Sequence, residues 1–207
     1  MLVQKLWKKS FTWDEILPEK IQKEWKEIQK LWNEVKEIII PRKLTKNGIV
    51  ADGELHAFVD ASLHTYATVL YLRNKTQQGY QSNLVLSKNR LAPIKGTSIP
   101  RLELLALLIG VRAISYVERE LKLPIIRRIV WCDSKCVLYW LKTSKILSVL
   151  VMNRLKEIKE AKGIKIHCVP SEENAADLAT QGCKSRELIR TESWWKGPSW
   201  LQQDESL

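Results

Sequence analysis

Four carboxylates stand where apolar segments of this sequence end or begin. In LHAFVDAS (55–62) the apolar residues recur at every second position, and the run ends at Asp60. Asp133 ends a later apolar run, Glu103 lies near the start of a long apolar segment, and Asp177 lies near the start of a short one. Gathered together, such groups would repel by about 4 kcal/mol for one pair at ~4 Å and an effective dielectric of 20. Divalent cations remove this cost: Mg²⁺ prefers oxygen ligands, and two ions roughly 3.5–4 Å apart support phosphodiester hydrolysis.

Each carboxylate alone also has a purely structural explanation. Glu103 and Asp177 would both favour the dipole of a helix that starts near them. Asp133 precedes Ser134, so this pair could simply cap the next helix. Four such explanations for four acids at one predicted edge are less economical than a shared metal site.

The elements that must position these acids follow from periodicity and turn residues. Strands are predicted at 55–60, 66–73, 80–88, 125–133 and 164–170, and helices within 96–121, 134–142, 146–163 and 174–182. Three strands joined by hairpins, followed by strands that alternate with helices, predict an α/β fold: a mixed five-stranded sheet with helices on both faces. In such a fold two strand ends and two helix starts can meet at one edge.

Residues 1–50 are predicted to form a separate N-terminal helical segment. Its apolar side chains recur every three or four positions, which indicates one face of a helix that docks onto a larger body: Ile21, Trp25, Ile28, Trp32, Val35 and Ile39. The turn residues of 45–54 place the boundary, so we expect the sheet domain at 51–192 and an irregular aromatic tail at 193–207.

Composition limits the class of protein. Of the 207 residues 45% are hydrophobic, which suffices for a core, yet none of the apolar runs reaches the roughly 18 residues of a membrane span. The start, MLVQKLWKKS, has no apolar export signal, so we expect a protein that is not secreted and has reduced cysteines. The four cysteines form no CxxC pair, which argues against zinc.

Charge favours a polyanionic partner. The net charge is +11, and positions 61–102 hold six cations and no acid: Arg73, Lys75, Lys88, Arg90, Lys95 and Arg101. A basic stretch beside Asp60 suits a nucleic-acid backbone.

The order Asp60, Glu103, Asp133, Asp177 on strand, helix, strand and helix resembles the ribonuclease H family. The short sequence motifs are most similar to the ribonuclease H segment of BEL/Pao retrotransposon Pol polyproteins, also labelled the Pao retrotransposon peptidase family. The resemblance covers about 55–201 through these motifs: FVDAS, YLR, IPRLELLA, WCDSKCVLYWL, NR, VPSEENAADLATQG and WWKGPSWL. The N-terminal segment resembles the linker that precedes the nuclease in that family.

This resemblance implies a metal-dependent endonuclease that cuts the RNA strand of RNA–DNA hybrids during reverse transcription. Asp60 would bridge two Mg²⁺ ions, for which Mn²⁺ would substitute. Asp177 would complete the site of the ion that activates water, while Glu103 and Asp133 would hold the other ion. The products would carry a 5′-phosphate and a 3′-hydroxyl.

The same resemblance implies partners and a location. The nucleic-acid contacts would come from Ser134, Asn153, Arg154 and Arg101. A reverse transcriptase domain of the same polyprotein would be a partner, and no membrane would be involved. The protein would work in a cytoplasmic retrotransposon particle or in the nucleus.

Departures from the family pattern keep other functions open. The loop VPSEENAAD lacks the histidine that many ribonucleases H carry there, although Glu172 or Glu173 could assist proton transfer; His167 lies in the preceding strand. TQG (180–182) replaces a more usual Ser-Arg-Gly. An inactive connection domain that binds nucleic acid or a polymerase is therefore an alternative.

Two further classes of enzyme are weaker alternatives. A DDE-type integrase would use Asp60, Asp133 and Glu172 or Glu173, and would leave Glu103 and Asp177 idle. An aspartic peptidase needs an Asp-Thr/Ser-Gly turn, which the sequence lacks.

Overall fold

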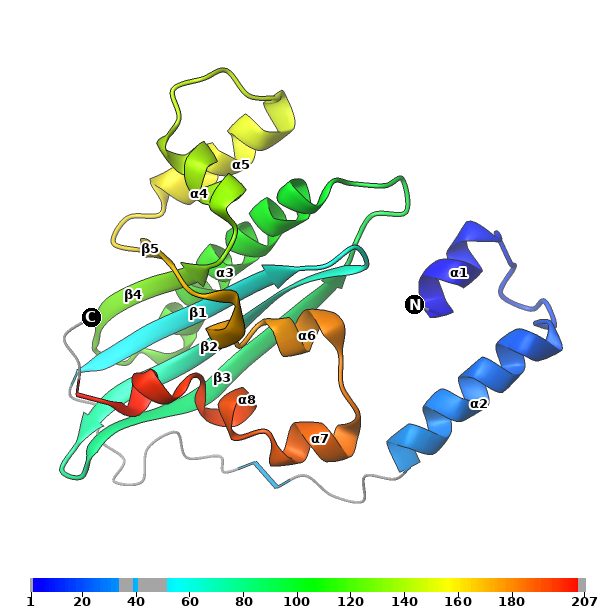
Figure 1. Ribbon diagram of the computed structural model, residues 1–207, viewed down its shortest axis with the longest axis horizontal. Coiled ribbons are helices and arrows are strands. Elements are labelled where there is room, and N and C mark those ends of the chain that lie inside the picture. The colour runs from blue at the N-terminus through cyan, green and yellow to red at the C-terminus, as the bar shows by residue number, and fades with distance from the viewer. Residues whose placement is uncertain (1, 34–38, 41–51, 205–207) are drawn as a thin grey trace.

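A five-stranded sheet forms the centre of the computed structural model, which describes residues 2–33, 39–40 and 52–204 (Figure 1). Its strand order is β3-β2-β1-β4-β5. β1 pairs antiparallel with β2 and parallel with β4, β2 pairs antiparallel with β3, and β4 pairs parallel with β5. The strands are β1 (Gly53–Ala61), β2 (Thr65–Thr76), β3 (Gly79–Leu91), β4 (Ile125–Cys132) and β5 (Lys165–Cys168). The predicted mixed α/β sheet is confirmed.

Helices lie on both faces of the sheet, as predicted. The α-helices are α1 (Leu2–Lys8), α2 (Glu19–Asn33), α3 (Ile99–Leu121), α4 (Lys135–Lys142), α5 (Val149–Glu160), α6 (Asp177–Gln181), α7 (Ser185–Arg190) and α8 (Glu192–Lys196). Two 3₁₀ turns, η1 (Ser171–Glu173) and η2 (Ser199–Gln202), complete the described elements. α7, α8 and η2 were not predicted, because the segment after Gly182 has no clear apolar period.

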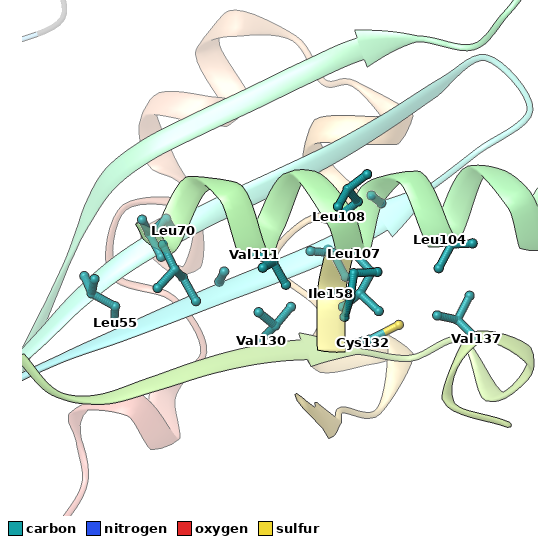
Figure 2. Packing of buried hydrophobic residues seen from close by; sticks show 14 of the residues in the cluster. Leu55, Leu70, Leu104, Leu107, Leu108, Val111, Val130, Cys132, Val137 and Ile158 are labelled. Atoms are coloured by element: carbon teal, nitrogen blue, oxygen red, sulfur yellow. The ribbon is translucent and has the colours of Figure 1, made fainter. Parts of the chain in front are cut away.

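The alternation along β1 divides its side chains between two cores. Leu55, Ala57 and Val59 belong to the larger core under α3, α4 and α5. Figure 2 shows α3 side chains, among them Leu107 and Val111, packed over the strands. The even-numbered positions face the other way, and Phe58 packs there against Trp131. Asp60 therefore continues the face that carries Phe58, toward the edge of the sheet.

The close approach of α3 to β1 depends on Gly110. A Cβ atom at this position would lie 2.6 Å from Cγ1 of Val59. Only glycine therefore allows the helix to lie this near the strand that carries Asp60.

The C-terminal segment covers the second face of the sheet. Trp194, Trp200 and Leu201 join the smaller core. Arg73 of β2 donates from Nε to the backbone oxygen of Leu201 (2.8 Å) and from an Nη to that of Gln203 (2.7 Å). These contacts support a boundary different from the predicted tail at 193–207, and we propose that the sheet domain continues through η2.

The N-terminal helices make few contacts with the sheet. In α1, Gln4 donates to the backbone oxygen of Ala92 (3.0 Å), and Lys5 pairs with Glu24 of α2 (2.9 Å). Figure 1 shows α2 standing apart from the sheet.

The predicted apolar face of α2 is largely uncovered. Ile21 is buried, but Trp25 is 42% exposed and Trp32 is 61% exposed, and Ile39 beyond the helix is 82% exposed. Val35 and the predicted boundary within 45–54 lie outside the described residues, apart from the stretch that begins at Asp52. The described domain therefore does not supply the body onto which this face was expected to dock.

Among the described residues, we find no helix with the length and apolar character needed to cross a membrane.

Candidate metal centre

Three of the four predicted acids meet at one edge of the sheet. Asp60 lies near the end of β1, Asp133 follows β4 directly, and Asp177 is the first residue of α6. One carboxylate oxygen from each lies within 4.8 Å of the others, and all three residues are partly exposed. Parallel pairing of β1 with β4 brings the first two together, and α6 adds the third from the opposite side.

Asp60 is held by α6. The Thr180 hydroxyl donates a hydrogen bond to Oδ2 of Asp60, and the backbone oxygen of Thr180 accepts from the Thr65 hydroxyl (3.0 Å). Asn174, at the start of the same segment, donates from Nδ2 to the backbone oxygen of Val59 (3.0 Å). These bonds fix the helix start that carries Asp177 against the strand that carries Asp60.

The other two acids of the group have weaker support. Asp133 accepts a hydrogen bond from the Ser171 hydroxyl at 2.9 Å, which ties it to η1. Asp177 has the Gln181 side-chain amide at 3.5 Å, which is at the limit of a hydrogen bond. Asp177 is thus the least restrained carboxylate of the three.

Glu103 borders the group without joining it. It is the fifth residue of α3 rather than a residue of the first turn, because the helix begins at Ile99. Its Oε2 accepts a hydrogen bond from the Ser134 hydroxyl. Ser134 also caps α4, since its Oγ accepts from the backbone N–H of Val137 at 3.3 Å.

The electrostatics of these carboxylates favour a cation. Burial raises the pKa of Asp60, and the negative charge of Asp133 raises it further, although the Thr180 hydroxyl opposes this. The pKa of Asp177 is raised to about 6 by burial and by the charges of Asp60 and Asp133. Burial and the same two aspartates raise the pKa of Glu103 against the effect of Ser134. Among the residues that the structure describes, none of the ion pairs involves these carboxylates, and such clustered carboxylate oxygens are a donor set that fits hard divalent ions.

The predicted nucleic-acid contacts are spread over three elements. Arg101 is exposed in the first turn of α3, and Asn153 is exposed on α5. Arg154 is partly buried, and one Nη donates to the backbone oxygen of Leu150 (3.0 Å). Ser134 is 6% exposed, and its hydroxyl already has two partners within the protein. The assignment of these four residues to nucleic acid stays a prediction.

The residues considered for proton transfer lie on two elements. Glu172 and Glu173 are exposed on η1, and Glu173 accepts a hydrogen bond from Nε1 of Trp200 at 2.8 Å. His167 is exposed on β5, with its ring 5.3 Å from that of Trp131. A cavity of about 360 Å³ adjoins Asp177, between η1 and the two tryptophans Trp194 and Trp200.

The sequence analysis did not predict a buried network of charged and polar side chains that extends over β1, β2 and β4. Arg73 donates to Oε2 of Glu54 at 2.8 Å, and His56 Nε2 contacts the same oxygen at 3.0 Å. The Trp131 indole donates to His56 Nδ1 at 3.1 Å, so the ring proton lies on Nε2 and points to Glu54. The sequence feature that could have indicated this network is the position of Glu54 and His56 on the same face of β1 as Phe58. Arg73, one of the six cations of the basic stretch 61–102, is 1% exposed and therefore does not face a nucleic-acid backbone.

A mixed sheet in this strand order, with helices on both faces and acids gathered at one edge, defines a ribonuclease H-like protein. The profile of the family described as "Pao retrotransposon-like RNaseH-like domain" matches residues 1–134. This match spans more than half of the chain, so the protein belongs to that family, as the sequence predicted.

Several solved structures are similar to the chain at low identity. They include RNase H1 from the archaeon Halobacterium salinarum NRC-1, with 12% identity over 60% of this chain and 89% of that one, at a TM-score of 0.38. LC11-RNase H1 in complex with an RNA/DNA hybrid has 15% identity over 66% of this chain and 99% of that one, at a TM-score of 0.43. The N-terminal RNase H domain of a Mycobacterium tuberculosis protein has 11% identity over 69% of this chain and 96% of that one, at a TM-score of 0.42. Among curated proteins, none matches.

Proposed function

We propose that this protein is a ribonuclease H that hydrolyses the RNA strand of RNA–DNA hybrids. The observation that carries the proposal is the cluster of Asp60, Asp133 and Asp177 on a ribonuclease H-like fold, in which one carboxylate oxygen of each lies within 4.8 Å of the others. A nuclease-type function agrees with this fold and family in general.

In this proposal the three aspartates hold two divalent ions, Mg²⁺ with Mn²⁺ as a substitute, and Glu103 contributes from α3. When bound, such ions activate a water molecule and stabilise the leaving oxygen. The protein's own contribution is positioning. Thr180 and Ser171 each restrain one carboxylate oxygen, on Asp60 and Asp133 respectively, and so hold these two acids in place for the ions.

Substrate binding in this proposal depends on the phosphate backbone. The net charge of +11 supports sequence-independent affinity. Arg101, Asn153 and Arg154 would contact the backbone, and the 2′-hydroxyls and groove shape would distinguish RNA from DNA. We further propose that the domain acts beside a reverse transcriptase of the same polyprotein, in a retrotransposon particle.

A gel assay with a labelled RNA–DNA hybrid tests the activity. We expect Mg²⁺- or Mn²⁺-dependent cleavage of the RNA strand, abolished by EDTA and reduced at least a hundredfold by Asp60→Asn or Asp133→Asn. Asp14→Asn, at an exposed aspartate outside the group, is the matched control. Cleavage that persists in both site variants would reject the assignment.

A second candidate is a connection domain that binds a polymerase or nucleic acid without cleavage. The exposure of Trp25 and Trp32 on α2 favours it, because an uncovered aromatic helix face suits a protein partner. Calorimetric titration with Mn²⁺ separates the two candidates: the nuclease requires binding that Asp60→Asn removes, whereas the connection domain requires none.

Asp177→Asn tests the integrase alternative, which predicts retained activity in that variant.

A further inference from the structure

A second polar cavity lies on the sheet, away from the carboxylates. Its volume is about 320 Å³. Its lining residues come from β4, from β5 and from the turn before β5, and they include Arg127, Arg128, Trp131, Gly163, Lys165 and His167. At about 3.3 Å per strand residue, Arg127 lies roughly 20 Å along β4 from Asp133, while Trp131 and His167 form the end of the cavity nearer to that acid. None of the three clustered aspartates lines the cavity, so its cationic end is separate from the candidate metal centre.

The cavity exists because β5 is shorter than β4. The two strands pair only from Ile129 with Lys165 to Cys132 with Cys168. Ile125, Arg127 and Arg128 of β4 have strand partners in β1, but within the described part of the chain residues 125–128 have none on the β5 side. The turn at Gly163, which has φ +76°, leads the chain into β5 beside this gap. The missing strand pairing leaves a notch in the edge of the sheet.

The notch carries positive charge that internal acids neutralise only in part. Arg127 is 42% exposed and forms a long ion pair with Oε1 of Glu54 at 3.8 Å. Through Oε2 the same carboxylate pairs with Arg73 at 2.8 Å and contacts His56 at 3.0 Å, so one negative charge serves two arginines. Lys165 is exposed and takes part in none of the ion pairs found among the described residues.

Arg128 differs from Arg127, since it forms an ion pair with Glu118. The excess positive charge of the notch thus lies on Arg127 of β4, which shares Glu54 with Arg73, and on Lys165 of β5. Two cations around an open cavity are suited to an anion with several oxygen atoms, such as a phosphate group.

Aromatic rings form the wall beside these cations. The rings of Trp131 and His167 lie 5.3 Å apart in a tilted arrangement, and His167 is exposed. Trp131 is buried and supports the exposed His167 ring, and an exposed planar ring beside cations offers a stacking surface for bases or sugars, which an acidic peptide would not use.

We propose that this notch binds the phosphate groups of a nucleic-acid strand, with Arg127 and Lys165 as the phosphate ligands and His167 as a stacking surface. The site is separate from the acids, so it adds affinity for a strand that extends beyond the cleaved bond. It would bind even if the domain did not cleave its substrate.

Fluorescence anisotropy with labelled single-stranded RNA and with RNA–DNA hybrid, in EDTA and over a range of salt, tests the proposal. Arg127→Gln with Lys165→Gln should weaken binding about tenfold at low salt and reduce the salt slope for the single strand by about 1.4, which is two phosphate contacts. The matched control is Arg119→Gln with Lys159→Gln, which removes the same charge from exposed positions outside the notch. Equal losses in the two double variants would overturn the proposal.

Two further measurements keep the result interpretable. Lys165→Glu alone changes an exposed side chain, so it should weaken strand binding even if the double variant is unstable; unchanged binding counts against the notch.

The His167 imidazole NMR signals should shift on addition of the oligonucleotide, and inorganic phosphate should produce that shift only at far higher concentration. If inorganic phosphate or polyglutamate binds as tightly as the oligonucleotide, the notch is not a nucleic-acid site. Hybrid cleavage at saturating substrate, measured separately, reports on the metal centre alone.

Discussion

The Thr180 hydroxyl donates to the Asp60 carboxylate and so links α6 to the end of β1, 120 positions apart in the sequence. Thr180 is 4% exposed, and Thr65 holds its backbone oxygen. The helix that presents Asp177 is therefore coupled to the strand that presents Asp60, and the two acids are positioned together.

Removing this hydroxyl tests its role in positioning. We expect Thr180→Val to weaken Mn²⁺ binding about fivefold, which corresponds to the ~1 kcal/mol of one hydrogen bond. Thr180→Ser keeps a hydroxyl and should restore most of the affinity, while Thr76→Val controls for the same change at the end of β2, away from Asp60. Isothermal titration calorimetry measures the affinity; equal Mn²⁺ affinity in the wild type and Thr180→Val would show that the bond does not position Asp60.

The raised pKa of Asp177 predicts a pH dependence of the metal-free protein. Its pKa is about 6 in the folded state, against an ordinary value of 3.8, because of burial and the nearby aspartates. Between these values the folded state binds more protons than the unfolded state, so the free energy of unfolding falls as pH rises from about 4 to about 6. Asp177→Asn should remove this fall, which we estimate at ~1 kcal/mol after solvent screening.

Urea denaturation in EDTA at pH 4.5 and pH 7 measures this difference. Mn²⁺ added in excess at pH 7 should stabilise the wild type more than Asp177→Asn, because only the wild type keeps the full ligand set. Identical pH profiles for the two proteins would contradict the assigned electrostatic coupling.

The buried network around Glu54 predicts a large loss of stability. Burial raises the pKa of Glu54, but the hydrogen bonds from His56 and Arg73 outweigh it and lower the pKa to about 2. Arg73→Met would leave this carboxylate buried without its main partner, which costs about 3–5 kcal/mol. Arg101→Met, at an exposed arginine, should change stability by less than ~0.5 kcal/mol.

Arg73 also holds the C-terminal segment through the backbone oxygens of Leu201 and Gln203. Limited proteolysis of Arg73→Met should therefore cut first within 193–204, before the sheet unfolds. Resistance of the segment to protease in Arg73→Met would refute its attachment through Arg73.

The lowered pKa of Glu54 stabilises the fold above about pH 4.5, and this contribution is lost as pH falls toward 2.

The contact of Gly110 with Val59 predicts a steric effect next to the metal centre. A methyl group at Gly110 would meet Cγ1 of Val59 at 2.6 Å, so Gly110→Ala should destabilise the protein by about 1–3 kcal/mol. Because Val59 precedes Asp60, Mn²⁺ affinity should fall as well. Val59→Ala in the same chain opens space and should recover part of both losses; a double variant no better than Gly110→Ala would argue against this contact.

The elements with a clear apolar period could be predicted from the sequence. The alternation in 55–60 predicted β1 and its two faces, and the long apolar segment predicted α3. The segment after Gly182 was harder, because Trp194, Trp200 and Leu201 follow no helical or strand period. Their burial depends on contacts with Phe58 and Tyr71, which lie more than a hundred positions earlier.

Residue type and position alone marked Asp60, Glu103, Asp133 and Asp177 as candidates, because carboxylates at the ends or starts of apolar segments need compensation. The order of these acids resembles that of ribonucleases H, and short motifs such as IPRLELLA and WCDSKCVLYWL predicted the family. Only the tertiary structure decided that Glu103 bonds to Ser134 beside the group, and that Arg73 is an internal cation rather than a surface one. Local sequence fixes which elements form and which faces are apolar. The partners of a polar side chain depend on how distant elements pack, since a hydrogen bond needs both groups within about 3 Å.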